Sequence, residues 1–215
     1  RFLNAVGIGP SDIVQNCFSY HFTPAGKMME SGALHLGATV FPAGVGNTEQ
    51  QAQVASALSV TSYCGTPEYL LSILNKAEEL NLDVSTIKKA AVSGGPLFPQ
   101  VRAEYVSRGI SCLQAYATAD IGAIAYESIS DEPMIVDENV LVEIVLPGTG
   151  LLVPEGEIGE VLVTTLNSDY PLVRFATGDL SAIAPGYSKC GRTNIRLVGW
   201  RGRADQAIKI KGMFS

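Results

Sequence analysis

The sequence predicts an α/β protein in which a parallel βαβ sheet subdomain is followed by a mostly antiparallel β subdomain. Between residues 34 and 116, short apolar segments alternate with segments of helical spacing, which is the rhythm of βαβ units. After residue 124 the helical spacing ends, and strand-like segments follow one another through short turns of glycine, proline and acidic residues. This change of rhythm predicts a boundary near residue 130.

The first subdomain is predicted over residues 1–130. Residues 6–14 are expected to form a loop that leads into a short strand or helix, with Ser11 or Asp12 as a cap. Strands are predicted at residues 38–41, 60–64, 88–92 and 111–116, and helices at 48–59, from 66 onward, and at 99–108.

Two of these helices begin with clear local signals. Thr48, followed by Gln51 three residues later, has the pattern of a capping box. Thr66 at the N-cap and Pro67 at the first helical position open the clearest helix of the chain. Ligands of parallel sheets bind beyond the carboxyl ends of the strands, so residues 93–96 and 116–120, each just after or at the end of a strand, are candidate site residues.

The second subdomain is predicted over residues 131–203. The strand-rich pattern already begins just before this boundary, with a strand at 123–128. Further strands are predicted at residues 140–146, 159–166 and 172–175. Thr177, Gly178 and Asp179 then interrupt the apolar pattern. Glycine allows the backbone to turn, and a carboxylate can accept two hydrogen bonds from a vicinal diol such as a ribose. A plain turn after a strand is the alternative interpretation of these three residues.

The composition is that of a well-buried globular chain. Hydrophobic residues make up 47% and charged residues 17% of the sequence. The net charge of -6 argues against a nucleic-acid partner, and no apolar run reaches the ~18 residues that a membrane span needs. Residues 189–215 nevertheless contain seven of the 15 Lys and Arg residues. This basic end suits an anionic small ligand, although a solvated charged surface would have the same composition.

The cysteines indicate a cytoplasmic protein with reduced thiols. Cys17, Cys64, Cys112 and Cys190 lie far apart and form no CxxC pair. No signal peptide is evident. We expect the four thiols to be mostly buried.

Four stretches, in order, resemble the adenylate-forming superfamily, and the most similar family is that of the phenylacetate–coenzyme A ligases. They are residues 93–97, 114–120, 170–180 and 202–212, and residues 12–51 fit that family as well. The resemblance covers nearly the whole chain and implies part of the large N-terminal domain of such an enzyme. Residues 204–215 would then form a hinge and the start of a C-terminal domain. Neither the phosphate loop nor the catalytic-lysine domain of the family is recognisable in these 215 residues.

The resemblance implies that ATP activates an aryl or related carboxylic acid to acyl-AMP and that coenzyme A then accepts the acyl group. In this chain the implied nucleotide-binding residues are the adenine-binding turn Ser93, Gly94, Gly95 and Pro96, the adenine-stacking Tyr116 with Ala117 and Thr118, the ribose-binding Asp179, and Arg203.

The remaining implied roles concern the metal, the acid and the hinge. Asp120 matches a magnesium ligand that is usually Glu in relatives. The acyl pocket candidates are Tyr20, His21 and Phe22, each of which could equally be an ordinary packing residue, and the hinge residue is Asp205, with Lys209 and Gly212 following in the same pattern. No zinc is expected, because Ser188 replaces the first Cys of a zinc-like Cys-x-Cys-Gly run of some relatives.

The sequence departs from the family pattern at two positions. Ala117 replaces a common glycine, and Ala119 stands where relatives often carry a hydroxyl that Thr118 could supply instead. These departures keep a non-catalytic relative possible, and three alternatives stay open in all. They are an adenylyltransferase or aminoacyl-activating domain without the coenzyme A step, a non-catalytic nucleotide-binding relative, and a nicotinamide or flavin oxidoreductase.

The oxidoreductase is disfavoured because Gly7 and Gly9 lack the third glycine of a GxGxxG motif. No catalytic residue is assigned in this segment, which we expect to bind an adenylate weakly without turnover. The acid substrate stays open, and so does a homodimer.

Overall fold

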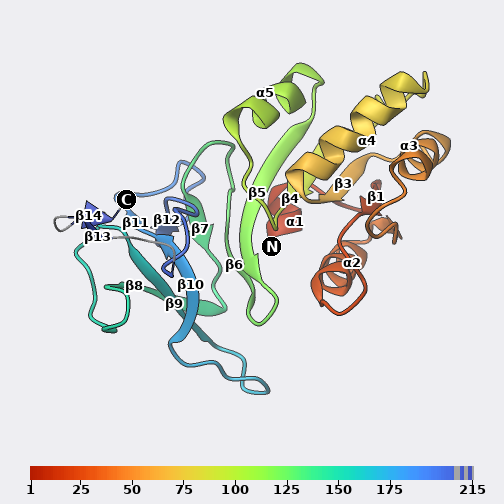
Figure 1. Cartoon of the computed structure of the whole chain (residues 1–215). Coiled ribbons are helices and arrows are strands. Elements are labelled where there is room, and N and C mark those ends of the chain that lie inside the picture. The colour runs from red at the N-terminus through yellow and green to blue at the C-terminus, as the bar shows by residue number, and fades with distance from the viewer. Residues whose placement is uncertain (206–208, 211–212, 215) are drawn as a thin grey trace. The chain divides into compact units, whose positions relative to one another are not determined.

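The computed structural model describes residues 1–205, 209–210 and 213–214, which form a mixed α/β structure with parallel and antiparallel sheets (Figure 1). The predicted fold class is therefore confirmed. The chain divides into two compact units, residues 1–115 and 116–215. The division falls earlier than the change of rhythm near residue 130, because Ile124, Ala125, Met134 and Val136 belong to the hydrophobic core of the second unit. The predicted three-part division, with residues 204–215 as a hinge, stays a prediction. None of the described helices is long and apolar enough to cross a membrane.

The first unit contains a parallel sheet with the strand order β2-β1-β3-β4-β5. Its strands are β1 (Ile13–Asn16), β2 (Thr39–Phe41), β3 (Ser62–Gly65), β4 (Lys89–Val92) and β5 (Ser111–Thr118). The predicted strands are present, and residues 6–14 lead into a strand rather than a helix. In this order the chain changes direction across the sheet between β1 and β3, and ligands of such sheets bind beyond the carboxyl ends of the strands at that point.

Five helices belong to this unit: α1 (Phe2–Ala5), α2 (Ala25–His35), α3 (Thr48–Ala57), α4 (Pro67–Glu79) and α5 (Pro99–Ser107). Helix α2 contacts β1 and β2, whereas α4 contacts β3 and has α3 and α5 as neighbours (Figure 1). The prediction for α4 is confirmed, since Pro67 occupies its first turn and its buried face presents Leu70, Ile73, Leu74 and Ala77.

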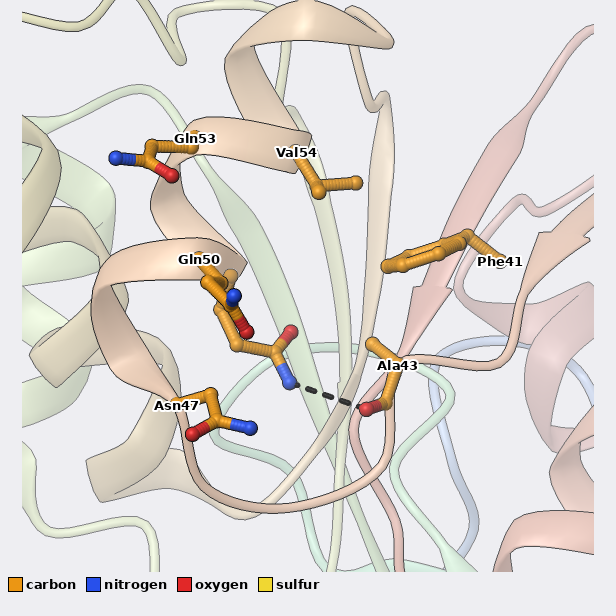
Figure 2. A pocket seen from close by; sticks show the side chains of 7 residues that line it. Phe41, Ala43, Asn47, Gln50, Gln53 and Val54 are labelled. Atoms are coloured by element: carbon orange, nitrogen blue, oxygen red, sulfur yellow. Dashed lines mark hydrogen bonds between the residues drawn. The ribbon is translucent and has the colours of Figure 1, made fainter.

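The capping box predicted at the start of α3 is wrong. Asn47 is the N-cap, in a left-handed conformation and without a side-chain cap bond. Gln51 is instead buried, and its Nε2 donates to the carbonyls of Ala43, Gly44 and Gly46 at 3.1–3.4 Å. Figure 2 shows the bond to Ala43 at the edge of a cavity of about 400 Å³. Gln51 was predicted to cap its own helix, but it holds the preceding loop.

The second unit is built from antiparallel strands. The first sheet has the order β10-β9-β8, and β11, β12, β7 and β6 pair in that order. The bounds are β6 (Gly122–Tyr126), β7 (Met134–Val136), β8 (Val140–Val145), β9 (Gly159–Thr165), β10 (Phe175–Ser181), β11 (Ile183–Ala184) and β12 (Arg196–Leu197), with a hairpin of β13 (Lys209–Ile210) and β14 (Met213–Phe214). The short strands β7, β11 and β12 were not predicted.

The last predicted strand is displaced. It was expected to end at Phe175, before Thr177, Gly178 and Asp179, whereas β10 runs from Phe175 to Ser181 and includes all three. The register against β9 shifts between Ala176 and Leu180, and Gly178 has a φ of +72°. These residues therefore form a β-bulge inside a strand, a device that redirects side chains out of the regular alternation.

Candidate functional site

The carboxylate of Asp179 is the centre of a polar cluster in the second unit. Its Oδ1 accepts hydrogen bonds from Trp200 Nε1 at 3.0 Å and from Arg203 Nη1 at 3.2 Å. Its Oδ2 accepts a hydrogen bond from the hydroxyl of Tyr116 at 2.9 Å. The Asp179 side chain is 14% exposed. The structure therefore brings three of the predicted nucleotide-binding residues together around one carboxylate that solvent can still reach.

Main-chain pairing sets this geometry. Residues 201–204 run antiparallel to the bulged part of β10, with Asp179 paired to Arg203. The amide of Leu180 donates to the carbonyl of Gly202 at 2.9 Å, and the amide of Ala204 donates to the carbonyl of Gly178 at 2.8 Å. Because this register fixes both backbones, the Arg203 side chain extends over the bulge, where Nη1 also donates to the carbonyl of Thr177 at 3.1 Å.

Gly178 makes room for the guanidinium group. A Cβ atom at this position would lie 2.7 Å from Nη2 and 3.0 Å from Cζ of Arg203. The φ of +72° is in the left-handed region, which residues with side chains rarely occupy. The glycine thus meets two requirements at once, a conformational one and a steric one.

Tyr116 supports Asp179 as a neutral donor. Burial raises the pKa of the Tyr116 phenol, and the negative charge of Asp179 adds to this effect, so the hydroxyl keeps its proton. The hydroxyl of Thr177, 3.1 Å from the phenol oxygen, donates to the carbonyl of Val161 and accepts from the amide of Asp179. A protonated Tyr116 beside an ionised Asp179 gives a charge-assisted hydrogen bond.

Trp200 was not among the predicted site residues. It is the only tryptophan of the chain and lies three positions before Arg203, which is the one local signal that could have drawn attention to it. Its side chain reaches Asp179 only because residues 198–204 return along β10. Sequence patterns carry no information on that return.

Asp120 belongs to the second unit and lies in the turn between β5 and β6. It is exposed and lines a cavity of about 440 Å³ with Asp137, Asn139 and Tyr170, a set that does not include Asp179. Oxygen donors of this kind suit a hard cation such as Mg²⁺. Among the described residues no group of three His, Cys, Asp or Glu side chains is arranged to hold a metal ion.

Ala117 and Thr118, which precede the turn with Asp120, are the last two residues of β5. Ala117 and Thr118 are partly buried at the end of β5, and the Thr118 hydroxyl oxygen accepts a hydrogen bond from the amide of Ile121 at 3.2 Å. This bond shapes the turn that carries Asp120. The Thr118 hydroxyl proton is not used in that bond and stays available as a donor.

The predicted adenine-binding turn lies in the first unit, directly after β4. Ser93 is buried, its Oγ donates to the carbonyl of Ala115 at 2.9 Å and its amide donates to the carbonyl of Gly65 at 3.1 Å. Gly94 has a φ of +75°, and Gln114 Nε2 donates to the carbonyl of Gly95 at 2.9 Å. Hydrogen bonds with the end of β5 therefore hold this glycine-containing turn in place. Pro96, at the end of the turn, is exposed.

The three acyl-pocket candidates have different environments within the first unit. Tyr20 is partly buried, accepts a hydrogen bond from Asn16 Nδ2 at 2.7 Å, and its ring lies so close to Gly26 that a Cβ there would be 2.9 Å from Tyr20 Cδ2. His21 is exposed, and Phe22 is fully exposed with a φ of +54°. A bulky residue with a left-handed backbone marks a strained turn.

The hinge candidate and the cysteines complete the predicted set. Asp205 is exposed, and its Oδ1 lies 3.6 Å from Nε of Arg203. Gly212 and the Lys209 side chain lie outside the described residues. All four cysteines are free thiols, with Cys190 exposed and the other three buried, so the expectation of mostly buried thiols is confirmed.

The chain matches the family model described as "AMP-binding enzyme" over residues 2–167. It is 32% identical to a phenylacetate-coenzyme A ligase from Escherichia coli (strain K12) and 29% identical to one from Thermus thermophilus. Each alignment covers 99% of this chain but 50% of the relative. The chain therefore spans about half the length of the curated relatives it matches.

Solved structures of CoA ligases also match this chain over about half of their length. A crystal structure of an open conformation of 2-hydroxyisobutyryl-CoA ligase, in complex with 2-HIB-AMP and CoA, superposes with a TM-score of 0.90 at 25% identity, over 100% of this chain and 50% of that one. The anthranilate CoA ligase AuaEII, in complex with anthranoyl-AMP, gives a TM-score of 0.70 at 18% identity, over 99% and 43% of the two chains. The second likeness supports the fold alone.

Proposed function

The chain belongs to the AMP-binding enzyme family, and we propose that it supplies the nucleotide-binding part of an AMP-forming acyl-CoA ligase for an aryl or related carboxylic acid. An oxygen of the acid would attack the α-phosphorus of ATP, and pyrophosphate would leave. The thiol of coenzyme A would then attack the acyl carbon, and AMP would leave. Relatives named as phenylacetate-coenzyme A ligases support the aryl acid. The free thiols support a reducing compartment such as the cytoplasm.

The observation that carries this proposal is the cluster around Asp179. A carboxylate that is partly exposed and held by Tyr116 and Arg203 is a suitable acceptor for the hydroxyl groups of a ribose. Arg203 also supplies a positive charge that would attract a nucleotide phosphate. We therefore assign the ribose to Asp179 and Arg203 in the second unit.

The metal, the adenine and the acid are assigned to residues of the two units separately. Asp120 would hold Mg²⁺, which would offset the phosphate charge during adenylate formation. In the first unit, the turn from Ser93 to Pro96 offers backbone groups to a flat ring, and Tyr20 with its exposed neighbours would contact the acid. Asp205 would act as the hinge residue.

The test uses a non-hydrolysable phenylacetyl-adenylate analogue titrated into this chain by calorimetry. We expect weak binding that Asp179→Ala reduces at least about tenfold, because the ribose loses its charged acceptor. Asp83→Ala is the matched control, since Asp83 is an exposed carboxylate of the first unit that bonds only to its neighbour Ser85. Binding that survives Asp179→Ala would contradict the ribose assignment.

The reaction itself is tested on the complete gene product. With ATP, Mg²⁺, phenylacetate and coenzyme A, we expect release of pyrophosphate and formation of a thioester, both lost in Asp179→Ala. Pyrophosphate release without any thioester would instead indicate an adenylate-forming domain that lacks the coenzyme A step. Absence of both products across a panel of aryl acids would overturn the proposed activity.

A further inference from the structure

Protein donors already occupy most of the acceptor positions of Asp179. Oδ1 accepts from Trp200 and from Arg203, and Oδ2 accepts from Tyr116. An ionised carboxylate accepts about four hydrogen bonds, two at each oxygen. Counting donors from the described residues, about one position is therefore open, and it is on Oδ2.

A ribose offers two neighbouring hydroxyl donors. With one open position, Asp179 can accept one of them, and the second can be accepted only if a protein donor leaves. Arg203 is also bound to the carbonyl of Thr177 and held by main-chain pairing. Tyr116 is partly buried, and burial raises its pKa, so it stays protonated and is a donor to Asp179 at 2.9 Å.

Of the three donors to Asp179, Trp200 has the fewest other contacts that hold it in place. Its indole has a single N–H, which bonds to Asp179, and 52% of the residue is exposed. After release, that N–H can bond to water without any rearrangement of the strand. The indole is therefore the group that a ligand would displace.

We propose that Trp200 determines how the site discriminates between ribose and deoxyribose, because its indole N–H occupies an acceptor position on Asp179 and yields it to the second hydroxyl of a ribose. The inference rests on the proposed function, in which Asp179 binds the ribose. A 2′-deoxynucleotide has one hydroxyl fewer, so it needs only the open position on Oδ2 and leaves Trp200 in place.

The experiment compares AMP with 2′-deoxy-AMP in calorimetric titrations of the wild-type chain and of Trp200→Phe. The variant keeps an aromatic ring and removes the competing donor. We expect the affinity for AMP to rise about three- to tenfold and the affinity for 2′-deoxy-AMP to stay the same, so their ratio changes by that factor. Tyr187→Phe is the matched control, because it removes one polar group from an exposed aromatic residue of the same unit and should leave the ratio unchanged.

Tryptophan fluorescence gives a second readout that requires no variant. Trp200 is the only tryptophan of the chain, so its emission reports this contact alone. AMP should shift the emission as the indole passes from the carboxylate to water, whereas 2′-deoxy-AMP at equal occupancy should leave it nearly unchanged. Equal shifts for both nucleotides would contradict displacement by the second hydroxyl.

The outcomes separate this inference from the proposal on which it rests. If AMP binding is lost in Asp179→Ala but Trp200→Phe leaves the nucleotide ratio unchanged, or weakens both nucleotides equally, the inference is overturned and the ribose assignment stands. If AMP binds equally well to Asp179→Ala, or does not bind at all, the ribose assignment itself is contradicted.

Discussion

Gly178 and Arg203 are matched so closely that a methyl group on Gly178 would lie 2.7 Å from Nη2 of the arginine. The glycine also has a φ of +72°, which a residue with a side chain would adopt only under strain. Any larger residue at this position would therefore require the guanidinium, which is the flexible end of the Arg203 side chain, to shift beside Asp179. This relationship joins the backbone of the bulge in β10 to the electrostatics of the candidate site.

Gly178→Ala should lower stability and weaken adenylate binding together. Gly148→Ala is the matched control, since Gly148 has a φ of +75° in the same unit and nothing within 4 Å of its would-be Cβ. We expect Gly148→Ala to lose about 1 kcal/mol in urea unfolding and to bind the adenylate analogue normally. Gly178→Ala should lose more, because strain and the clash with Arg203 add. If both variants lost the same unfolding free energy and Gly178→Ala bound the adenylate analogue normally, the predicted clash with Arg203 would be contradicted.

Gln51→Ala should destabilise the first unit by roughly 2 kcal/mol. The substitution leaves the carbonyls of Ala43, Gly44 and Gly46 without this donor. It also removes the side-chain acceptor of the buried Gln15 Nε2, which keeps only its bond to the Gln51 carbonyl at 3.3 Å. Gln53→Ala, on the same helix, removes an exposed glutamine (Figure 2) and should change the free energy of unfolding by less than about 0.5 kcal/mol.

The same measurement distinguishes the observed role of Gln51 from a capping box. In a capping box, Thr48 and Gln51 contribute through reciprocal bonds, so Thr48→Ala would cost about as much as Gln51→Ala. The structure leads us to expect a clearly smaller loss for Thr48→Ala, because the start of α3 has no side-chain cap bond. Similar losses at both positions would restore the capping interpretation.

Asp12→Asn should remove a pH-dependent part of the stability. The buried carboxylate of Asp12 accepts from Lys89 Nζ at 2.8 Å, from the hydroxyls of Thr61 and Ser62, and from the amide of Gly9. Burial acts to raise the pKa of Asp12, but these four donors outweigh it and hold the pKa below the ordinary 3.8. The substitution should cost roughly 2–4 kcal/mol at pH 7, because Lys89 loses its buried partner.

The sign of the pH effect follows from that lowered pKa. The folded state favours the ionised carboxylate, so its contribution is complete above the unfolded pKa near 3.8 and is lost as the pH falls through the folded value. The difference in unfolding free energy between wild type and Asp12→Asn should be constant from pH 7 to about pH 5 and shrink below pH 4. A difference that grows on acidification would contradict the assignment. Asp169→Asn, at an exposed site, is the control.

Asp120→Asn should raise the Mg²⁺ concentration needed for adenylate formation by the complete gene product. We expect a shift of about tenfold or more, since the variant removes the negative charge from the proposed metal ligand. Asp169→Asn changes an exposed carboxylate of the same unit that does not line the cavity, and should leave the Mg²⁺ requirement unchanged. An identical Mg²⁺ dependence in both variants would contradict the assignment of Asp120 as a metal ligand.

Local patterns were sufficient for most elements of the first unit, although helices α1 and α2 were not predicted. Thr66, Pro67 and the spacing of Leu70, Ile73 and Leu74 predicted the start and the buried face of α4, because helix capping and amphipathic spacing act over a few residues. The alternation of strands and helices predicted a parallel sheet for a similar reason, since each βαβ unit is a local arrangement.

The same local patterns failed wherever a partner lay far along the chain. Gln51 had the spacing of a cap, yet its partners are the preceding loop and Gln15 on a neighbouring strand. The β10 strand was predicted to stop before Thr177, because a bulge and a turn have the same glycine signal until the partner strand is known.

The sequence by itself determined the fold class and the positions of Tyr116, Asp179 and Arg203 as candidate ligand contacts, because residue type and order are enough for a family resemblance. Only the tertiary structure decided what surrounds Asp179. Residues 198–204 return along β10, and this pairing brings Trp200 and Arg203 to one carboxylate oxygen and requires a glycine at position 178. Such contacts depend on strand register across more than twenty positions, which no local pattern specifies.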